Sequence, residues 1–394
     1  MMLALEMYRS LPRYVAARAV GGRIPGVLTG PAAPVRLVNR DEPRVDRPGW
    51  ARVRPVLAGI CGSDLGALFG HTSLYFSALV SMPFVPGHEV VGELVDDCED
   101  LPKGTRVVLD SVLACAARGI EPCPSCQAGT PNRCDRVTVG HVSPGLQTGY
   151  CADTGGGWGG VMVAHRSQLH AVPDELSDER AVLVEPLACA VRTALRAQVG
   201  EGDAVLVSGA GSVGLFVTLA LRELTPAGRI TVVAKHARQR ELARAFGATD
   251  VRAPSEVVGT VRRATQAFRL VPERGPDYLL GGVDVAIDAV GSKSSLDTAL
   301  RVTRAGGRVV LLGMPSTGAD LSPVWFRELE VAGAYASGGA EAFATAMRIA
   351  ATAPLDGIVG GRYPLYRWRE ALDHAQSAGR LGTVKVAFDV RSTS

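Results

Sequence analysis

The sequence predicts an α/β protein with two domains, one made mainly of short β-strands and one built on a doubly wound parallel sheet. The chain has 394 residues, more than one compact core usually holds. Up to about residue 186 it is rich in glycine, proline and cysteine, whereas residues 200–335 alternate strand-like and helical segments. We therefore expect domains at residues 1–188 and 189–336, with residues 337–394 returning to the first domain.

The composition is that of a soluble globular protein. The chain is 47% hydrophobic and 21% charged, with a formal net charge of +3. Its Lys and Arg residues are scattered, so neither nucleic acid nor a membrane surface is expected as a partner. The apolar N-terminal run is too short for a signal peptide, and no stretch reaches the ~18 apolar residues of a membrane span. We expect a cytoplasmic protein.

The first domain is expected to contain short strands joined by long loops. Residues 106–109 and 161–164 are strand-like runs with glycine and proline around them.

The second domain alternates buried-strand candidates with helical segments. Strands are expected at residues 204–208, 230–234, 283–289 and 308–312, and helices at 212–224, 238–246 and 294–303. Gly247 stands where a helix C-cap favours glycine. A helix at residues 340–351 and a strand at 383–389 follow, and the βαβ pattern predicts a parallel sheet.

A glycine-rich turn joins the first strand and helix of this region. Gly209, Gly211 and Gly214 form a GxGxxG pattern, and Ser212 and Val213 open the helix. Alone this pattern is weak, but the strand and helix that it requires are both in place. It predicts that the backbone binds the pyrophosphate of a dinucleotide at the helix N-terminus.

The residues after the second strand bear on the choice of cofactor. An acidic residue near position 234 would bind the ribose hydroxyls of NAD, but Lys235, His236, Arg238 and Arg240 follow there instead. These residues favour NADP(H) over NAD(H). The alternative is an ordinary solvated helix start, although cations are unfavourable at that end of a helix.

Three separate segments carry residues that suit a catalytic zinc. Cys61 lies in GICGSD, His88 and Glu89 lie in PGHEVVG, and Glu185 begins EPL. A thiolate, an imidazole and a carboxylate with one open position form the usual catalytic set. Taken singly, each residue could be a buried cysteine, a core histidine or a surface carboxylate.

Together with GAGSVG, these motifs resemble the zinc-containing medium-chain dehydrogenase/reductase superfamily over residues 35–390. The EPL segment is most similar to the sorbitol, butanediol and threonine dehydrogenase branch. The resemblance implies a GroES-like catalytic domain and a Rossmann nucleotide-binding domain. It also implies a zinc-dependent transfer of hydride between NAD(P)(H) and a secondary alcohol or polyol, or the matching ketone or aldehyde.

The resemblance assigns roles to individual residues. It makes Cys61 and His88 zinc ligands and leaves open which of Glu89 and Glu185 binds directly. Ser63 matches the hydroxyl that relays the proton. Relatives often extend this relay with a histidine at the position of Gly66, so the outer proton path must differ here. Further residues expected to contact the cofactor are Val290, Gly313 and Lys385.

A second cysteine cluster matches the structural zinc lobe of the family. Cys123, Cys126 and Cys134 have the expected spacing, but the expected fourth ligand is Ile120. We expect Cys115 to complete a closed four-thiolate site. The alternative is a vestigial lobe with free thiols.

The substrate and the assembly are less defined. Tyr150 and Trp158 either line the pocket or belong to an exposed loop, and Tyr75 and Phe76 lie in another plausible pocket wall. Two alternative functions are reduction of an imine, iminium or activated double bond, and non-catalytic binding of nucleotide or zinc. The resemblance implies a homodimer or homotetramer that pairs residues 329–335.

Overall fold

The computed structural model describes residues 1–20, 29–30, 33–44, 46–315 and 318–392. The chain forms two compact units, one of Met1–Glu185 with Ala336–Ser394 and one of Pro186–Tyr335. Both changes of unit fall within a few residues of the domain limits expected from the sequence.

The second unit is built on a six-stranded sheet with the order β10-β9-β8-β13-β14-β15. Its strands are β8 (Ala204–Ser208), β9 (Arg229–Val233), β10 (Asp250–Arg252), β13 (Val283–Asp288), β14 (Thr303–Leu311) and β15 (Glu330–Gly333). Every neighbouring pair is parallel, which confirms the predicted doubly wound sheet. The strand order reverses between β8 and β13, and ligands of such sheets bind at that point, beyond the carboxyl ends of the strands.

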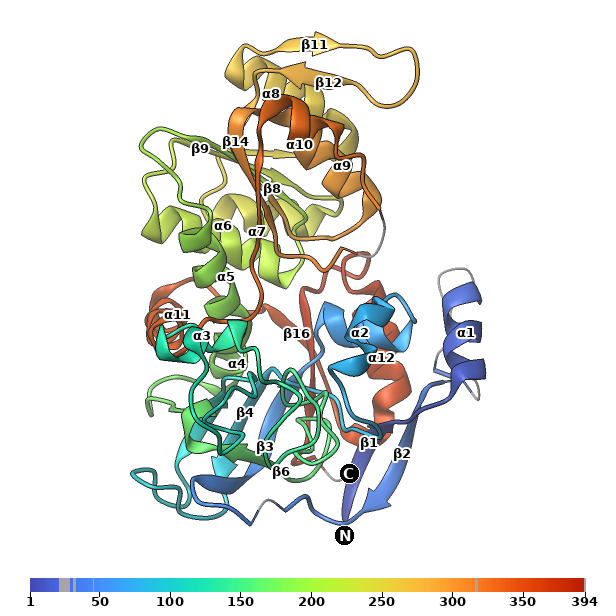
Figure 1. Ribbon diagram of the computed structural model, residues 1–394, viewed down its shortest axis with the longest axis vertical. Coiled ribbons are helices and arrows are strands. Elements are labelled where there is room, and N and C mark those ends of the chain that lie inside the picture. Colours follow the sequence, from blue (N-terminus) through green and yellow to red (C-terminus); the bar gives the residue numbers. More distant parts are fainter. Residues whose placement is uncertain (21–28, 31–32, 45, 316–317, 393–394) are drawn as a thin grey trace. The chain divides into compact units, whose positions relative to one another are not determined.

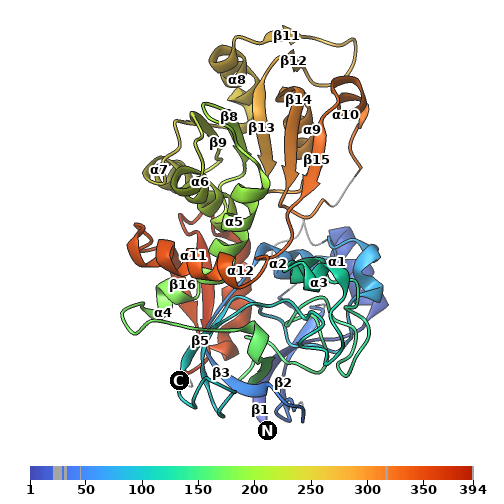
Figure 2. The same ribbon diagram turned by 60° about the vertical axis from the view of Figure 1, so that its left-hand side comes forward.

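Helices cover both faces of this sheet (Figures 1 and 2). They are α6 (Ser212–Leu224), α7 (Ala237–Ala245), α8 (Val257–Thr265), α9 (Lys293–Val302) and α10 (Ser322–Arg327), after α5 (Val184–Arg196). Helix α6 contacts α7, whereas α9 contacts α8 and α10. Strand β8 and helix α6 have the bounds that the sequence predicts.

Two features of this unit were not expected from the sequence. Helix α8 follows the 3-10 turn Pro254–Glu256, and a hairpin of β11 (Phe268–Leu270) and β12 (Tyr278–Leu280) precedes β13. All three residues of β11 are exposed, so this strand shows no alternation of buried and exposed positions.

The first unit contains a mainly antiparallel sheet with the order β16-β17-β3-β4-β5-β7, and β6 pairs with β3. Its strands are β3 (Trp50–Gly59), β4 (Val90–Leu94), β5 (Arg106–Leu109), β6 (Met162–His165), β7 (Leu169–Ala171), β16 (Val359–Tyr363) and β17 (Lys385–Asp389). Because β17 pairs with β3, the end of the chain returns to the first unit.

The remaining elements of this unit surround the sheet. A separate ribbon pairs β1 (Met2–Met7) with β2 (Val35–Arg40). The helices are α1 (Leu11–Val20), α2 (Gly62–Leu68), α3 (Pro124–Gln127), α4 (Asp178–Ala181), α11 (Ala340–Thr352) and α12 (Trp368–Ser377), and the 3-10 turns are Leu74–Ala78, Pro131–Arg133, Arg166–Gln168 and Leu365–Arg367.

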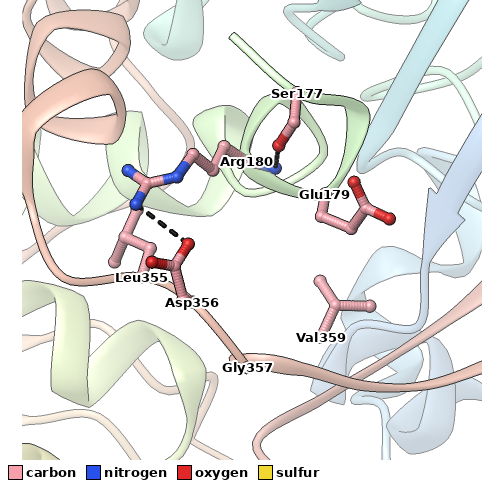
Figure 3. Close-up of a pocket in the computed structure, with 7 residues that line it drawn as sticks. All are labelled: Ser177, Glu179, Arg180, Leu355, Asp356, Gly357 and Val359. Atoms are coloured by element: carbon pink, nitrogen blue, oxygen red, sulfur yellow. Dashed lines mark hydrogen bonds and ion pairs between the residues drawn. The ribbon is translucent and has the colours of Figure 1, made fainter.

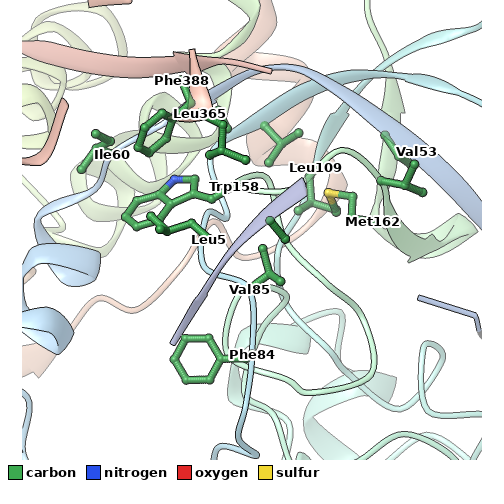
Figure 4. Close-up of a cluster of buried hydrophobic side chains, with 14 of the residues drawn as sticks. Leu5, Val53, Ile60, Phe84, Val85, Leu109, Trp158, Met162, Leu365 and Phe388 are labelled. Atoms are coloured by element: carbon green, nitrogen blue, oxygen red, sulfur yellow. The ribbon is translucent and has the colours of Figure 1, made fainter. Parts of the chain in front are cut away.

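Trp158 lies at the centre of the hydrophobic core of the first unit (Figure 4). Its side chain is fully buried, and its ring packs edge-on against Phe388 with centroids 5.2 Å apart. Leu5 of β1 lies beside it and donates its backbone N–H to the carbonyl of Trp158 at 2.9 Å. Both expectations for Trp158, a pocket wall or an exposed loop, are therefore wrong, because the β1 ribbon covers it.

Among the residues that the structure describes, no helix combines the length and the apolar character that crossing a bilayer requires.

Candidate active site

Neighbouring strands of the first unit bring the three metal-ligand candidates together. Cys61 follows the end of β3, and His88 and Glu89 immediately precede β4. Ala58 of β3 pairs with Val90 of antiparallel β4, so the two strand ends are adjacent. The ligand atoms of Cys61, His88 and Glu89 all lie within 4.8 Å of one another.

Glycine at position 59 makes room for this cluster. A Cβ atom there would overlap the carboxylate of Glu89, whose side chain is completely buried. The segment GICGSD therefore contributes two things to the site: the thiol of Cys61, and Gly59, which leaves space for the Glu89 carboxylate because it has no side chain.

Asp64 connects two of the ligand candidates, and the sequence analysis gave it no role. Its Oδ2 accepts the backbone N–H of Cys61 at 3.0 Å, and its Oδ1 lies 3.5 Å from Nδ1 of His88. An imidazole whose Nδ1 faces a carboxylate presents Nε2 on its other side, as metal-binding histidines commonly do. The expectation that such a histidine has a carboxylate partner could have identified Asp64 from the GSD sequence.

His88 is buried, which disfavours its protonated form. The carboxylate of Asp64 outweighs this effect and raises the pKa of His88 well above its ordinary value.

Lys385 belongs to this cluster. Its ammonium is 2% exposed and donates to Oε1 and Oε2 of Glu89 at 2.7 and 2.6 Å and to the carbonyl of Ile60 at 3.5 Å. These contacts use all three N–H donors of the ammonium, and the expected contact of Lys385 with the cofactor stays a prediction. Burial favours the neutral amine, but Glu89 and Cys61 together keep the pKa of Lys385 above its ordinary value.

Glu185 and Ser63 lie in the first turns of two helices. Glu185 belongs to α5, is 6% exposed and adds to the negative charge that acts on Lys385. Its carboxylate is not one of the described ligand atoms that lie within 4.8 Å of one another, which are those of Cys61, His88 and Glu89. Ser63 belongs to α2, and its Oγ is buried.

The residues of the cluster fit a zinc ion. Thiol, imidazole and carboxylate are the donors of catalytic zinc sites. Ser63 Oγ is buried, yet it makes no well-aligned hydrogen bond with another described protein atom. Buried polar atoms are normally satisfied, so this hydroxyl points to a ligand at the site.

The structure also brings together four cysteines in the lobe that contains α3. Cys115, Cys123, Cys126 and Cys134 have sulfurs within 4.8 Å of one another. Cys115 lies 3.5 Å from Cys134, and Cys123 lies 4.0 Å from Cys134. Tetrahedral Zn–S bonds of ~2.3 Å place sulfurs about 3.8 Å apart, so the spacing fits zinc.

The environment of this lobe favours a thiolate at one position. Backbone N–H groups of Asp135 and Cys126 lower the pKa of Cys123 to about 6. Burial has the opposite effect on Cys134 and raises its pKa to about 12. Cys123 can therefore be a thiolate near neutral pH, whereas ionisation of Cys134 as well would require a cation bound to the cluster.

A buried arginine supports the same lobe. Arg118 is completely buried, and its guanidinium donates to the carbonyls of Leu113, Val139, Val142, Ser143 and Gly145 at 2.6 to 3.4 Å.

The glycine-rich turn of the second unit has the geometry of a dinucleotide site. Gly209 has φ of +103°, which favours glycine, and a Cβ on Gly214 would overlap the carbonyl of Gly209. Gly211 has open space where a side chain would be, and it caps α6, whose first residues are Ser212 and Val213. Backbone N–H groups of this helix end are therefore accessible to a phosphate.

The other cofactor candidates of this unit follow the carboxyl ends of its strands. Lys235 and His236 follow β9, Val290 follows β13, and Gly313 follows β14. Lys235 is exposed, and its carbonyl accepts a hydrogen bond from Arg240 at 2.8 Å. These ends share one edge because the strands are parallel, so the residues surround the predicted crevice.

A separate hollow of about 200 Å³ lies in the first unit (Figure 3). Arg180 crosses it and donates to Asp356 at 3.0 Å and to the carbonyl of Ala350 at 2.7 Å. Its lining contains neither a thiol nor an imidazole, so it does not provide the metal-ligand chemistry described above.

Comparison with known proteins identifies the family. The family models for the alcohol dehydrogenase GroES-like domain and the zinc-binding dehydrogenase match residues 47–174 and 212–352. L-idonate 5-dehydrogenase of Vitis vinifera is 30% identical over 72% of each chain. Sorbitol dehydrogenase of Arabidopsis thaliana is 31% identical over 73% of this chain and 74% of its own. The chain belongs to the zinc-dependent medium-chain alcohol dehydrogenase superfamily.

Solved structures of this superfamily agree with the fold. A zinc-binding dehydrogenase from Sinorhizobium meliloti 1021, bound to NADP, is 26% identical over 99% of both chains, with a TM-score of 0.71. An alcohol dehydrogenase from Thermus sp. ATN1 is 27% identical over 91% of this chain and 97% of its own, with a TM-score of 0.70. The protein is therefore an NAD(P)-linked oxidoreductase of alcohols, with a GroES-like and a Rossmann domain.

Proposed function

We propose that the chain oxidises a secondary alcohol or polyol with NADP⁺, or reduces the matching carbonyl with NADPH, at a zinc held by Cys61 and His88. The observation that carries this proposal is the buried cluster of thiol, imidazole and carboxylate with its unsatisfied Ser63 hydroxyl. The relatives named for idonate, arabinitol and sorbitol support a polyhydroxylated substrate.

The two glutamates share the carboxylate role at this metal. Lys385 contacts both oxygens of Glu89, so that carboxylate is already neutralised. The charge of Glu185 also acts on Lys385, so we propose that the two carboxylates share one position at the metal, one bound directly and the other exchanging.

The protein side chains then divide the remaining tasks. A zinc held by Cys61 and His88 would supply a Lewis acid that lowers the pKa of a bound hydroxyl, and a nicotinamide at the glycine-rich turn would supply the hydride acceptor. Asp64 orients His88 through Nδ1, and the hydroxyl of Ser63 accepts the substrate proton and passes it outward. Gly66 carries no side chain to continue this path, so the outer part of the path must use other groups.

A substrate panel tests this function. Sorbitol, L-idonate and D-arabinitol would each be incubated with NADP⁺, and formation of NADPH followed at 340 nm. We expect turnover of at least one of them, near-complete loss in Cys61→Ser, and a loss of about 10²-fold or more in Ser63→Ala. Turnover that persists in Cys61→Ser would contradict the proposed site.

We propose NADP(H) as the preferred cofactor because cationic groups follow β9. Lys235 is exposed, and Asp250, the nearest acidic residue in the neighbouring strand, is paired with Arg229 at 2.5 Å. We expect NADPH to bind at least about 10-fold more tightly than NADH, and Lys235→Glu to reverse the order. Lys103→Glu, an exposed change in the other unit, serves as the control. Tighter binding of NADH by the wild type would refute this preference.

We propose that Cys115 completes a structural zinc site and that the protein is a homodimer or homotetramer. Strand β15 lies at the edge of its sheet, with Val331 43% exposed. In the preceding helix α10, Trp325 and Phe326 are 84% and 66% exposed. Pairing of residues 329–335 between two copies would cover this edge. Light scattering should give a dimer or tetramer for the wild type and a smaller species for Val331→Lys; a monomeric wild type would contradict the assembly.

A further inference from the structure

A tyrosine outside the recognised motifs lies against the proposed catalytic metal cluster. The hydroxyl of Tyr150 donates to Oδ1 of Asp64 at 3.4 Å. Its ring centroid lies 6.0 Å from that of His88 and 5.2 Å from that of Phe84. Tyr150 therefore touches both the imidazole and the carboxylate that faces it.

The backbone around Tyr150 is held next to the backbone before His88. The N–H of Tyr150 donates to the carbonyl of Gln147 at 3.1 Å, which closes a tight turn. Gly149 has φ of +86°, and a Cβ there would lie 3.3 Å from the backbone of Gly87. The turn and the residue preceding His88 are thus in close contact, so the phenol has a defined position relative to the imidazole.

Asp64 is the residue through which the phenol can act. Its Oδ2 is held by the N–H of Cys61, while its Oδ1 faces both Nδ1 of His88 and the hydroxyl of Tyr150. Asp64 is only 2% exposed, so water does not replace a lost donor easily. The phenol hydroxyl carries a proton that it donates to this carboxylate.

We propose that Tyr150 is a positioning residue of the catalytic metal site: its hydroxyl fixes the carboxylate of Asp64, which in turn holds His88 in the orientation that binds the metal. This inference rests on the proposed function, because it requires a metal at Cys61 and His88. The Tyr150 hydroxyl is part of a chain from phenol to carboxylate to imidazole, and its removal should loosen the metal without disturbing the four-cysteine lobe.

The test uses Tyr150→Phe, which removes one oxygen and keeps the ring. The zinc affinity of each site would be measured in the full-length protein by competition with a chromogenic chelator, and Co²⁺ alone would be used to record the visible bands of the catalytic site. We expect Tyr150→Phe to weaken the catalytic site about 10-fold, as loss of outer hydrogen-bond partners commonly does, and to shift the Co²⁺ bands. The four-cysteine site serves as the internal reference and should not change.

Two further variants separate positioning from packing. Tyr75→Phe makes the same exchange at a ring that is 78% exposed, and it should leave both affinities unchanged. Asp64→Asn should weaken the catalytic site at least as much as Tyr150→Phe. The double variant should lose little more than Asp64→Asn alone, because the phenol acts through that carboxylate.

The outcomes distinguish this inference from the proposed function. Unchanged affinity and unchanged Co²⁺ bands in Tyr150→Phe would overturn the role of Tyr150, as would full additivity with Asp64→Asn. If the wild type binds no metal that Cys61→Ser removes, the proposed function itself fails, and the role of Tyr150 fails with it.

Discussion

Replacing Lys385 by methionine should destabilise the first unit strongly. Lys385 is 2% exposed and Glu89 is fully buried, and both oxygens of Glu89 accept hydrogen bonds from the ammonium. Methionine fills most of the volume of the lysine stem but leaves the carboxylate without a cation. Breaking a buried ion pair from one side costs about 3–5 kcal/mol, so we expect a loss of that size in the free energy of unfolding.

The pH dependence of this loss follows from the desolvated carboxylate. Without the ammonium of Lys385, the buried charge of the Glu89 carboxylate is uncompensated, and acidic solution removes that charge. The deficit of Lys385→Met should therefore be smallest near pH 4 and grow toward pH 7.

Urea unfolding of the protein as purified, at pH 7 and at lower pH, measures this effect. In the double variant Glu89→Gln/Lys385→Met neither member of this buried pair is charged, so most of the lost stability should return. Arg36→Met breaks an ion pair whose arginine is 57% exposed, and it should change stability by less than about 1 kcal/mol. The reasoning is refuted if Lys385→Met is as stable as the wild type, or if the double variant is no more stable than the single one.

Three further predictions address the lobe, the nucleotide turn and a buried histidine. Cys115→Ser should weaken zinc binding in the lobe by more than about 100-fold, whereas Cys98→Ser, a buried thiol outside the cluster, should leave the zinc content unchanged. Gly211→Ala should fold normally, because nothing lies within 4 Å of the added Cβ, but its affinity for NADPH should fall about 10-fold or more. Gly259→Ala in α8, where the added Cβ would meet only the side chain of Arg263 at 3.5 Å, should bind normally. Burial lowers the pKa of His170 to about 4. The contribution of the neutral imidazole to the free energy of unfolding, up to about 3 kcal/mol, should therefore be present above about pH 6.5 and disappear as the pH falls toward 4. The urea midpoint of His170→Phe should change less over this pH range than that of the wild type. The three predictions would be contradicted, in turn, if Cys115→Ser bound as much zinc as the wild type, if Gly211→Ala bound NADPH as tightly as the wild type, or if the stability of His170→Phe changed with pH as that of the wild type does.

The sequence predicts the parallel sheet well because its signals are local. Strand β8, the turn from Gly209 to Gly214 and helix α6 follow one another directly, and each has the residue pattern of its element. The residues of the two candidate metal sites could also be identified from the sequence, because cysteine, histidine and glutamate seldom occur together in motifs with this spacing. Hairpin β11–β12 escaped prediction because its short strands are exposed and show no periodicity.

The features that the sequence did not predict are contacts between residues distant in the chain. Lys385 lies 296 positions from Glu89, and only the pairing of β17 with β3 brings the two together. Trp158 follows several glycines, which indicates a loop, but strand β1 from the other end of the unit buries it. Asp64 and Tyr150 are 86 positions apart, so their contact could not be read from either segment alone.

The most direct test of this account is the zinc content of the protein purified without chelator, measured together with NADPH binding. We predict two zinc ions per chain for the wild type, one for Cys61→Ser and one for Cys115→Ser, with NADPH binding retained in both variants because the nucleotide turn belongs to the other unit. A wild type without zinc, or a Cys61→Ser variant that keeps both ions, would contradict the assignment of Cys61, His88 and their carboxylate partners as the catalytic metal site.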